Sequence, residues 1–368
     1  MIEFLEGLFA STFWTAVIKV VAAFALLMVT VLVLVWLERR LIAAMQNRIG
    51  PNRAGPFGLL QTVADGVKLF FKESIRPRRA EFGLYLLAPI AAAIPAFLIF
   101  LVIPIGRPFT IGQTRVTMQV ADLNVAILFV LAMSSIAVYS IVLSGWASGS
   151  KYPLLGGVRA TAQMISYETA MALSLVPVVL FASAQIAGGS VGVGTMSLST
   201  IVELQAGSFR GPIPGWFVFW LVPSFIVFFI AGVAETNRPP FDMVEAESEL
   251  VGGYHTEYSG VRFALFFLAE YISMFNIAAL TVTLFLGGWL GPDFGLPPWI
   301  AWAMPTFWFL LKTYALVCVF VWIRASLPRM RYDRLMTFGW KRLIPFSLAW
   351  LVLFALLQSW RRFGAPWS

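Results

Sequence analysis

Long apolar runs separated by short polar segments dominate the sequence. Eight of these runs have about the length of roughly 20 residues that an α-helix needs to cross a bilayer. They lie near residues 14–36, 82–104, 122–144, 162–184, 215–234, 263–288, 301–323 and 344–360. The pattern predicts an all-α, polytopic membrane protein with about eight transmembrane helices, in a single membrane domain covering residues 1–368.

Residues 57–73, FGLLQTVADGVKLFFKE, form a further apolar segment with a different pattern. Apolar and polar side chains each recur at helical spacing, which gives the segment one apolar and one polar face. Its charged residues make it a poor span, so the pattern predicts an amphipathic helix at the membrane interface. The preceding basic segment, QNRIGPNRAGPFG, contains Gly–Pro pairs that exclude a continuous helix, and it suits an anionic lipid, a partner protein or the mouth of a cavity.

Composition agrees with a membrane protein, because 60% of the residues are hydrophobic, 12% are charged and the mean hydropathy is +0.84. Soluble domains carry about 25% charged residues. The only cysteine, Cys318, excludes a disulfide framework and any CxxC metal or iron–sulfur site. The only histidine, His255, argues against a multi-histidine centre, so no metal site is expected.

Lysine and arginine are distributed unevenly among the loops, which in a membrane protein records orientation rather than nucleic-acid binding. The odd-numbered loops hold 19 of these residues and the opposite side holds five, while Lys19 and Lys312 fall inside spans. The bias predicts that the odd-numbered loops, with the interfacial helix in the first, face the cytoplasm, or the matrix in an organelle. Both termini then lie on the periplasmic side.

Ionisable residues occur inside the predicted spans, where each costs at least about 2.5 kcal/mol. Glu168, Glu270 and Lys312 lie within spans, and Glu235 closes the fifth. One interpretation is that Glu–Lys pairs lock the bundle. The other is that the carboxylates face an internal proton path, because loss of solvent favours their protonated form and so suits a relay.

Six of the 18 acidic residues gather between residues 234 and 260. Asp242 and Glu245 have the spacing of a helix-capping box after a Pro–Pro pair, which gives these two a structural explanation. Asp242, Glu245 and Glu249 fall on one helical face and repel each other, whereas Glu247 points away. The segment is therefore either a solvated acidic helix or a set of carboxylates that share protons.

Five segments, in order along the chain, closely resemble a known family. They are ERRLIAAMQNRIGPNRAGPFGLLQTVADGVKLFFKE, SGWASGSKYPLLGGVRATAQMISYE, AETNRPPFDMVEAESELVGGYHTEYSG, FALFFLAEY and WIRASLPRMRYDRLM. The resemblance, from about residue 14 to residue 350, is to the membrane subunit of NADH-quinone oxidoreductase that mitochondria contain as subunit 1 of respiratory complex I. It implies an eight-span bundle that forms most of the quinone-access chamber. Quinone, either ubiquinone or menaquinone, would be a substrate at a shared site, and flavin and iron–sulfur clusters would lie in the peripheral arm.

The resemblance also implies roles for individual residues. The quinone chamber would be lined or bordered by Arg39, Asp65, Phe267 and Arg324. An acidic chain linking quinone chemistry to proton pumping would comprise Glu38, Glu168, Glu235, Glu245, Glu247, Glu249 and Glu270. Arg48 and Arg53 would lie in the loop that meets the peripheral arm.

The resemblance implies a subunit without a redox centre in a proton-translocating NADH:quinone reductase, next to peripheral-arm quinone-site subunits and other membrane subunits. The expected location is the bacterial inner membrane, or the mitochondrial inner membrane in an organelle. The membrane-anchor subunit of an energy-converting hydrogenase is an alternative that shares the fold and loop motifs, although the full QNRIGPNRAGPFGLLQ and AETNRPPFDMVEAESELV favour complex I. A stand-alone transporter is a third possibility, but the pattern shows no inverted repeat with paired broken spans.

Overall fold

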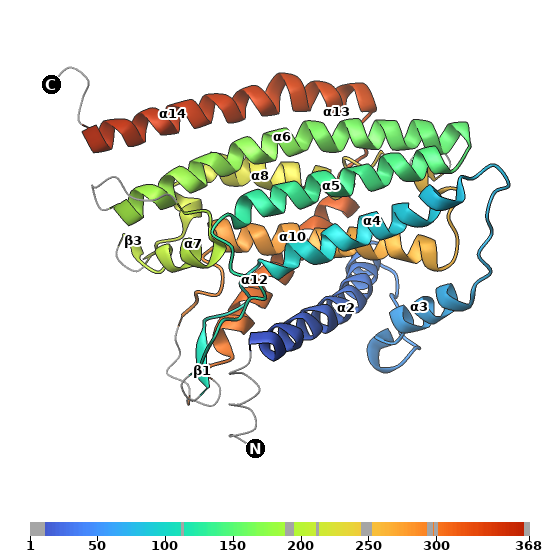
Figure 1. The fold of residues 1–368 in the computed structure, drawn as a ribbon, viewed down its shortest axis with the longest axis horizontal. Coiled ribbons are helices and arrows are strands. Elements are labelled where there is room, and N and C mark those ends of the chain that lie inside the picture. The colour runs from blue at the N-terminus through green and yellow to red at the C-terminus, as the bar shows by residue number, and fades with distance from the viewer. Residues whose placement is uncertain are drawn as a thin grey trace.

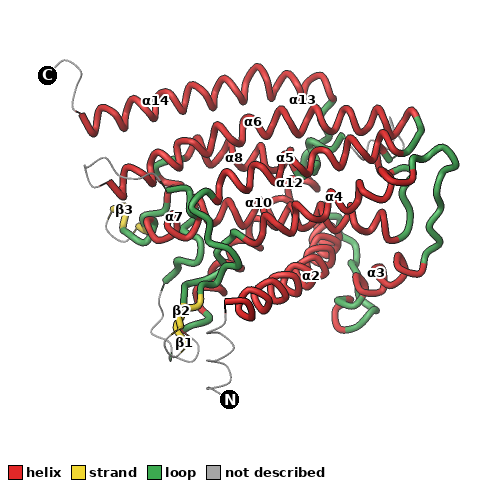
Figure 2. Tube along the Cα trace, viewed as in Figure 1, coloured by secondary structure: helices red, strands yellow, loops and turns green. Residues whose placement is uncertain are grey.

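Helices make up nearly all of the regular structure in the described part of the chain (Figure 1). The computed structural model describes residues 12–111, 114–187, 195–210, 213–243, 252–292, 297 and 301–363. Two short antiparallel hairpins lie between helices (Figure 2), pairing β1 (Phe109–Ile111) with β2 (Thr114–Val116) and β3 (Ser208–Arg210) with β4 (Ile213–Pro214). The predicted all-α class is confirmed.

Seven helices of the described residues are long and apolar enough to cross a membrane. They are α2 (Thr12–Met45), α4 (Phe82–Leu101), α5 (Ala126–Ala147), α6 (Lys151–Ala187), α10 (Val261–Phe285), α12 (Met304–Ser326) and the continuous unit of α13 (Tyr332–Phe338), η4 (Gly339–Leu343) and α14 (Ile344–Phe363). They correspond to every predicted span except the fifth. Helices α4, α5, α6 and α14 run side by side, whereas α2 crosses the bundle obliquely (Figure 1).

The fifth predicted span, residues 215–234, is not one long helix. A 3-10 turn, η2 (Phe217–Phe219), lies near its start, and the 14-residue helix α8 (Val222–Glu235) follows. At 1.5 Å per residue α8 is about 21 Å long, which is shorter than a hydrocarbon core of about 30 Å. It packs on α6, α10 and α14. The expectation of eight full-length spans is therefore corrected, for the described residues, to seven long helices and one short enclosed helix.

The amphipathic segment forms a 3-10 turn, η1 (Pro56–Gly58), followed by α3 (Gln61–Phe71), as its pattern predicts. This helix lies outside the bundle, beside one end of α2 (Figure 1). Its apolar face is uncovered, with Phe70 71% and Phe71 88% exposed. The Trp36 indole of α2 donates a hydrogen bond to the Phe57 carbonyl at 2.9 Å, which attaches the start of the segment to the bundle. These features suit a helix in the membrane interface.

A continuous apolar core lies between α4, α5, α6, α8 and α10. Two short elements pack on opposite ends of this core, namely α7 (Leu198–Leu204) and the 3-10 turn η3 (Gly253–His255). His255 contacts the rings of Tyr254, Phe263 and Phe266. Burial lowers the pKa of His255 to about 3, so this histidine is neutral at physiological pH.

Candidate functional site

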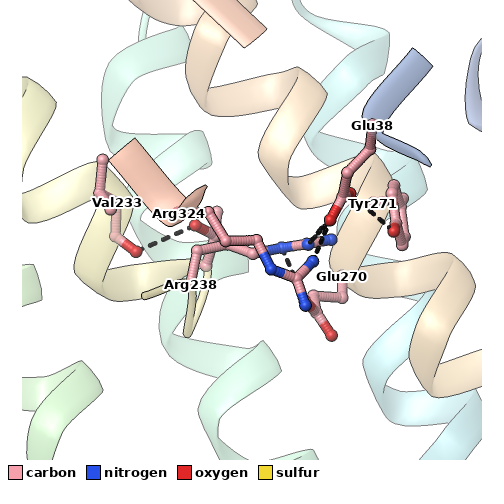
Figure 3. Close-up of polar contacts among 7 residues, drawn as sticks. Glu38, Val233, Arg238, Glu270, Tyr271 and Arg324 are labelled. Atoms are coloured by element: carbon pink, nitrogen blue, oxygen red, sulfur yellow. Dashed lines mark hydrogen bonds and ion pairs between the residues drawn. The ribbon is translucent and has the colours of Figure 1, made fainter. Parts of the chain in front are cut away.

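Glu38 and Arg238 form the centre of a buried group of charged side chains (Figure 3). Glu38 belongs to α2 and Arg238 to the turn after α8, and their side chains are 5% and 4% exposed. Nη1 of Arg238 donates to both carboxylate oxygens of Glu38, at 3.1 and 3.2 Å. Arg324 of α12 also pairs with Glu38, and the Tyr271 hydroxyl of α10 donates to its Oε2 at 2.8 Å. The Glu38 carboxylate therefore joins three other segments of the chain.

Glu270 lies on the other side of Arg238 and completes what we call the charged cluster, which consists of Glu38, Arg238, Glu270, Tyr271 and Arg324 (Figure 3). Nε of Arg238 lies 2.9 Å from Oε1 of Glu270, and its guanidinium stacks 4.5 Å from the ring centre of Tyr271. Two arginines thus face two glutamates. Because an unpaired buried charge is far more costly than a matched set, the four charged residues depend on one another.

Gln163 of α6 holds the turn that carries Arg238. Its side-chain amide donates to the carbonyl of Ala234, before the turn, at 2.8 Å, and to the carbonyl of Phe241, after the turn, at 2.7 Å. The polar sequence ETNR directly follows the last apolar residues of α8. The chain therefore places an arginine in the interior where the short helix stops, and α6 fixes its position.

A small cavity joins the charged cluster to Glu235. Its lining includes Glu235, Glu270, Asn237 and Ser273, and its volume is about 60 Å³. One carboxylate oxygen of Glu235 is buried without a hydrogen-bond partner among the described residues. A buried water needs about 10–15 Å³ and at least two polar partners. The cavity therefore has the size and the polar groups to hold water between the two carboxylates.

A second cavity, of about 50 Å³, extends from Glu235 along α5 and α10. Its lining is mostly apolar but includes Ser134 and Asn276. The Ser134 hydroxyl donates to Glu168 of α6 at 3.2 Å, and Oδ1 of Asn276 has no hydrogen-bond partner in the described part of the chain. Arg238 thus links Glu38 to Glu270, the first cavity links Glu270 to Glu235, and the second cavity with Ser134 links Glu235 to Glu168.

The chamber residues predicted on α2 and α3 form a separate pair. Nη1 of Arg39 lies 2.5 Å from Oδ2 of Asp65, and the two side chains are 44% and 34% exposed. This pair is far more accessible than the centre of the charged cluster. Phe267 of α10 packs on Tyr271 with ring centres 4.7 Å apart, and Arg324 is itself a cluster member. Two of the four predicted chamber residues thus lie at the cluster and two lie at the interfacial helix.

One family match contains all of these residues. The model of the family described as NADH dehydrogenase matches residues 18–355 of the chain. The chain belongs to the NADH dehydrogenase family. This is the family of the complex I membrane subunit that is numbered 1 in mitochondria, as the five sequence segments predicted. The chain is therefore a membrane subunit of an oxidoreductase complex and assembles with other complex I subunits.

The other residues predicted for this complex I subunit lie apart from the cluster or beyond the described chain. Arg48 and Arg53 are exposed in the loop between α2 and α3. The structure does not describe Glu245, Glu247 and Glu249. Asp242, expected to cap a helix with Glu245, is buried and lines a small pocket beside the cluster arginines. Among the described residues, no three His, Cys, Asp or Glu side chains converge as a metal site.

Arg238 and Tyr271 are cluster members that the sequence patterns did not indicate. Each stands near a predicted glutamate, since Arg238 follows Glu235 by one helical turn and Tyr271 directly follows Glu270. The sequence offered one signal for Arg238, which is the only lysine or arginine in the acidic segment 234–260. Buried carboxylates need a positive partner, and Arg238 is the only such partner that this segment contains. Tyr271 offered no such signal, since aromatic residues make up 15% of the chain.

Lys312 pairs with no glutamate that the structure describes, which corrects, for these residues, the interpretation that Glu–Lys pairs lock the bundle. Its Nζ donates to the carbonyls of Leu286 and Gly288 at 2.8 and 3.2 Å, just beyond the last turn of α10, and lies 4.3 Å from the ring centre of Trp216. A cation suits this position because the last carbonyls of a helix lack partners. Lys312 therefore binds the turn that follows α10, and the arginines of the charged cluster pair with Glu38 and Glu270 instead.

Proposed function

We propose that this chain forms the membrane part of the quinone-access chamber in a proton-pumping NADH:quinone oxidoreductase, and that its acidic residues begin the coupling path. In this proposal the chamber lies between α2, α3, α10 and α12, with Arg39, Asp65, Phe267 and Arg324 along it. Family membership supports the reaction class. The packing of α3 on both α2 and α10 supports the location, because it gathers these elements at one end of the bundle.

The observation that carries the proposal is a charge-balanced cluster with water-sized spaces leading from it. Arg324 is the more exposed of its two arginines, with 29% of its side chain accessible. A quinone headgroup that becomes anionic on reduction attracts this arginine and weakens its contact with Glu38. The Glu38 carboxylate then keeps only Arg238 as a cation in a site of low dielectric constant, so its negative charge becomes less stable. Proton uptake by the cluster restores the balance.

The two cavities supply the onward route in this proposal. A proton at Glu270 crosses the first cavity through water to Glu235, and crosses the second toward Ser134 and Glu168. A serine hydroxyl both donates and accepts hydrogen bonds, which suits it to a relay. Glu245, Glu247 and Glu249 follow the turn that carries Arg238, and we assign them the delivery of protons to the cluster.

The cluster end of the subunit faces the cytoplasm of a bacterium, or the mitochondrial matrix, in this proposal, and the subunit lies in the corresponding inner membrane. The excess of lysine and arginine in the odd-numbered loops supports this orientation. Arg48 and Arg53 contact the peripheral arm, whose subunits hold the flavin and iron–sulfur clusters. In a Cys318→Ser background, cysteines at positions 53 and 334 should be labelled only from the cytoplasmic side, and labelling from the periplasm would contradict the orientation.

Glutamine substitutions test the coupling path, because they keep side-chain size while removing one site from a coupled set of titrating groups. In vesicles containing assembled complex, Glu235→Gln and Glu168→Gln should lower quinone-dependent NADH oxidation and ΔpH formation together. NADH oxidation by ferricyanide should persist, because that electron path ends in the peripheral arm. Glu203→Gln, at an exposed position on α7, is the matched control. Wild-type pumping by both buried variants would show that these carboxylates are structural only.

The composition of the purified complex separates this proposal from the hydrogenase alternative. A complex I assembly should contain flavin and oxidise NADH, whereas an energy-converting hydrogenase contains nickel. If the complex that contains this chain holds nickel and does not oxidise NADH, the subunit belongs to an energy-converting hydrogenase instead.

A further inference from the structure

A basic pocket opens on the surface where α4 begins and α5 turns into α6. Its volume is about 530 Å³, and its lining includes Arg78, Arg79, Ser150, Lys151 and Glu257. The three basic side chains form no ion pair with any residue that the structure describes. Three cations against one carboxylate leave the pocket with a net positive charge, so its natural ligand is an anion.

The backbone reinforces the positive potential and fixes the shape of the pocket. Helix α6 is 37 residues long and begins at Lys151, so its unpaired amide groups and the positive end of its dipole lie at the pocket. Gly149 has φ +62°, and a Cβ there would lie 2.5 Å from the Arg79 carbonyl oxygen, so the α5–α6 turn packs directly on the chain before α4. The Glu81 amide donates to the Ala147 carbonyl at 3.0 Å and joins the same two segments.

Aromatic side chains mark the depth of this pocket in the membrane. Phe82, Trp146 and Tyr152 lie at the helix ends around it and are 52%, 66% and 57% exposed. Tryptophan and tyrosine concentrate at the level of the lipid headgroups. Farther from the pocket, α5 exposes Tyr139 and α6 exposes Leu155, which provides apolar surface in the direction of the bilayer core. An anion bound in the pocket therefore lies at headgroup depth above a surface that suits acyl chains.

We propose that this pocket binds the phosphate group of an anionic phospholipid whose acyl chains lie along α5 and α6. Basic pockets between transmembrane helices recognise anionic headgroups. A pair of arginines suits phosphate because each guanidinium presents paired donors to its oxygens. The aromatic side chains and the apolar surface beyond them favour a lipid over an acidic segment of a partner protein. A free phosphate ion shares the charge of the headgroup but lacks the chains, so experiment can separate the two.

The test uses the intact complex in phosphatidylcholine bilayers that contain a minor fraction of photoactivatable phosphatidylglycerol. Crosslinks are mapped to residues 76–82 and 146–155, the two segments that supply the basic side chains of the pocket. The pocket variant is Arg78→Gln/Arg79→Gln/Lys151→Gln. The control removes the same number of exposed cations from another surface and is Arg334→Gln/Lys341→Gln/Arg342→Gln. Because each basic residue near the surface contributes about a fivefold factor in lipid affinity, the pocket variant should bind on the order of 100-fold more weakly. The control should match the wild type.

Competition in the wild-type complex decides the question even where the variant assembles poorly. Unlabelled phosphatidylglycerol should suppress the mapped crosslinks, whereas inorganic phosphate at the same concentration should not. Equal competition by phosphate would overturn the lipid assignment and leave a simple anion site. Absence of crosslinks to either segment in the wild type would also overturn it. So would a pocket variant that keeps its crosslinks but loses a neighbouring subunit, because the pocket would then be a protein contact.

Discussion

Replacing Arg238 by glutamine tests whether the charged cluster behaves as one unit. Arg238 contacts both Glu38 and Glu270, and its side chain is 4% exposed. The substitution leaves two carboxylates with one arginine, so one buried negative charge loses its partner. Removing one member of a buried ion pair costs about 3–5 kcal/mol. The same substitution at Arg331, which pairs with Asp333 on the surface, should cost less than about 1 kcal/mol.

A second substitution separates charge imbalance from general damage to packing. Glu38→Gln alone leaves two arginines with one glutamate, so it should destabilise the subunit by a similar amount. The double variant Arg238→Gln/Glu38→Gln keeps one arginine, Arg324, and one glutamate, Glu270, so the cluster again has equal numbers of positive and negative side chains. We therefore expect the double variant to be more stable than the sum of the single effects predicts, by roughly 0.5–3 kcal/mol.

Chemical and thermal unfolding of the subunit within the purified complex, for the single, double and Arg331→Gln variants, provides the measurement. The amount of assembled subunit in the membrane gives an independent ranking of the same variants by stability. Additive effects in the double variant would refute the reasoning, because residues that share one charge balance cannot act independently. An Arg238→Gln variant as stable as Arg331→Gln would refute it as well, since the buried position would then carry no electrostatic cost.

Three further outcomes follow from the structure. Arg39→Ala and Asp65→Asn should each lower quinone reduction several-fold while ferricyanide reduction by NADH persists, and equal loss of both activities in an assembled complex would contradict the chamber assignment. Lys312→Met should destabilise the subunit by roughly 1–3 kcal/mol, because carbonyls after α10 lose their donor, yet proton pumping per assembled complex should stay unchanged. Because the pKa of His255 is lowered to about 3 in the folded chain, only the unfolded chain binds this proton below about pH 6.5, and the free energy of unfolding should fall as the pH is lowered. His255→Gln should remove this part of the pH dependence in denaturant titrations.

Local periodicity carries enough information to locate the long helices and the interfacial helix. An apolar run of about 20 residues predicts a transmembrane helix, because a single segment in lipid can satisfy all of its backbone hydrogen bonds only as a helix. The apolar and polar faces in residues 57–73 likewise predict that α3 lies at the boundary between lipid and water. Neither inference needs knowledge of what the helix packs against.

The break before α8 and the composition of the cluster depend on tertiary contacts, which a local pattern does not contain. Residues 215–234 carry one local signal of the break, Pro223 at the start of α8, but α4 and α6 also contain prolines inside continuous helices, so a proline in an apolar run does not by itself locate a break. Glu38 and Arg238 lie 200 positions apart, and only the folded chain brings them together. Lys312 binds backbone carbonyls, which every residue possesses, so nothing in the sequence distinguishes its partners from any others.

The position of α3 makes the proposed chamber entrance depend on the mechanics of the lipid layer. The uncovered apolar face of α3 ties this helix to the plane of the headgroups, while the Arg39–Asp65 pair ties it to α2, a 34-residue rod that crosses the hydrocarbon. A rod longer than the local hydrocarbon thickness tilts when the bilayer thins, whereas a helix in the interface moves with the surface. This ion pair and the hydrogen bond from Trp36 to the Phe57 carbonyl thus connect two bodies that respond differently to membrane thickness. If the chamber opens between α2 and α3 as proposed, lateral pressure and chain length of the surrounding lipids change the width of its entrance.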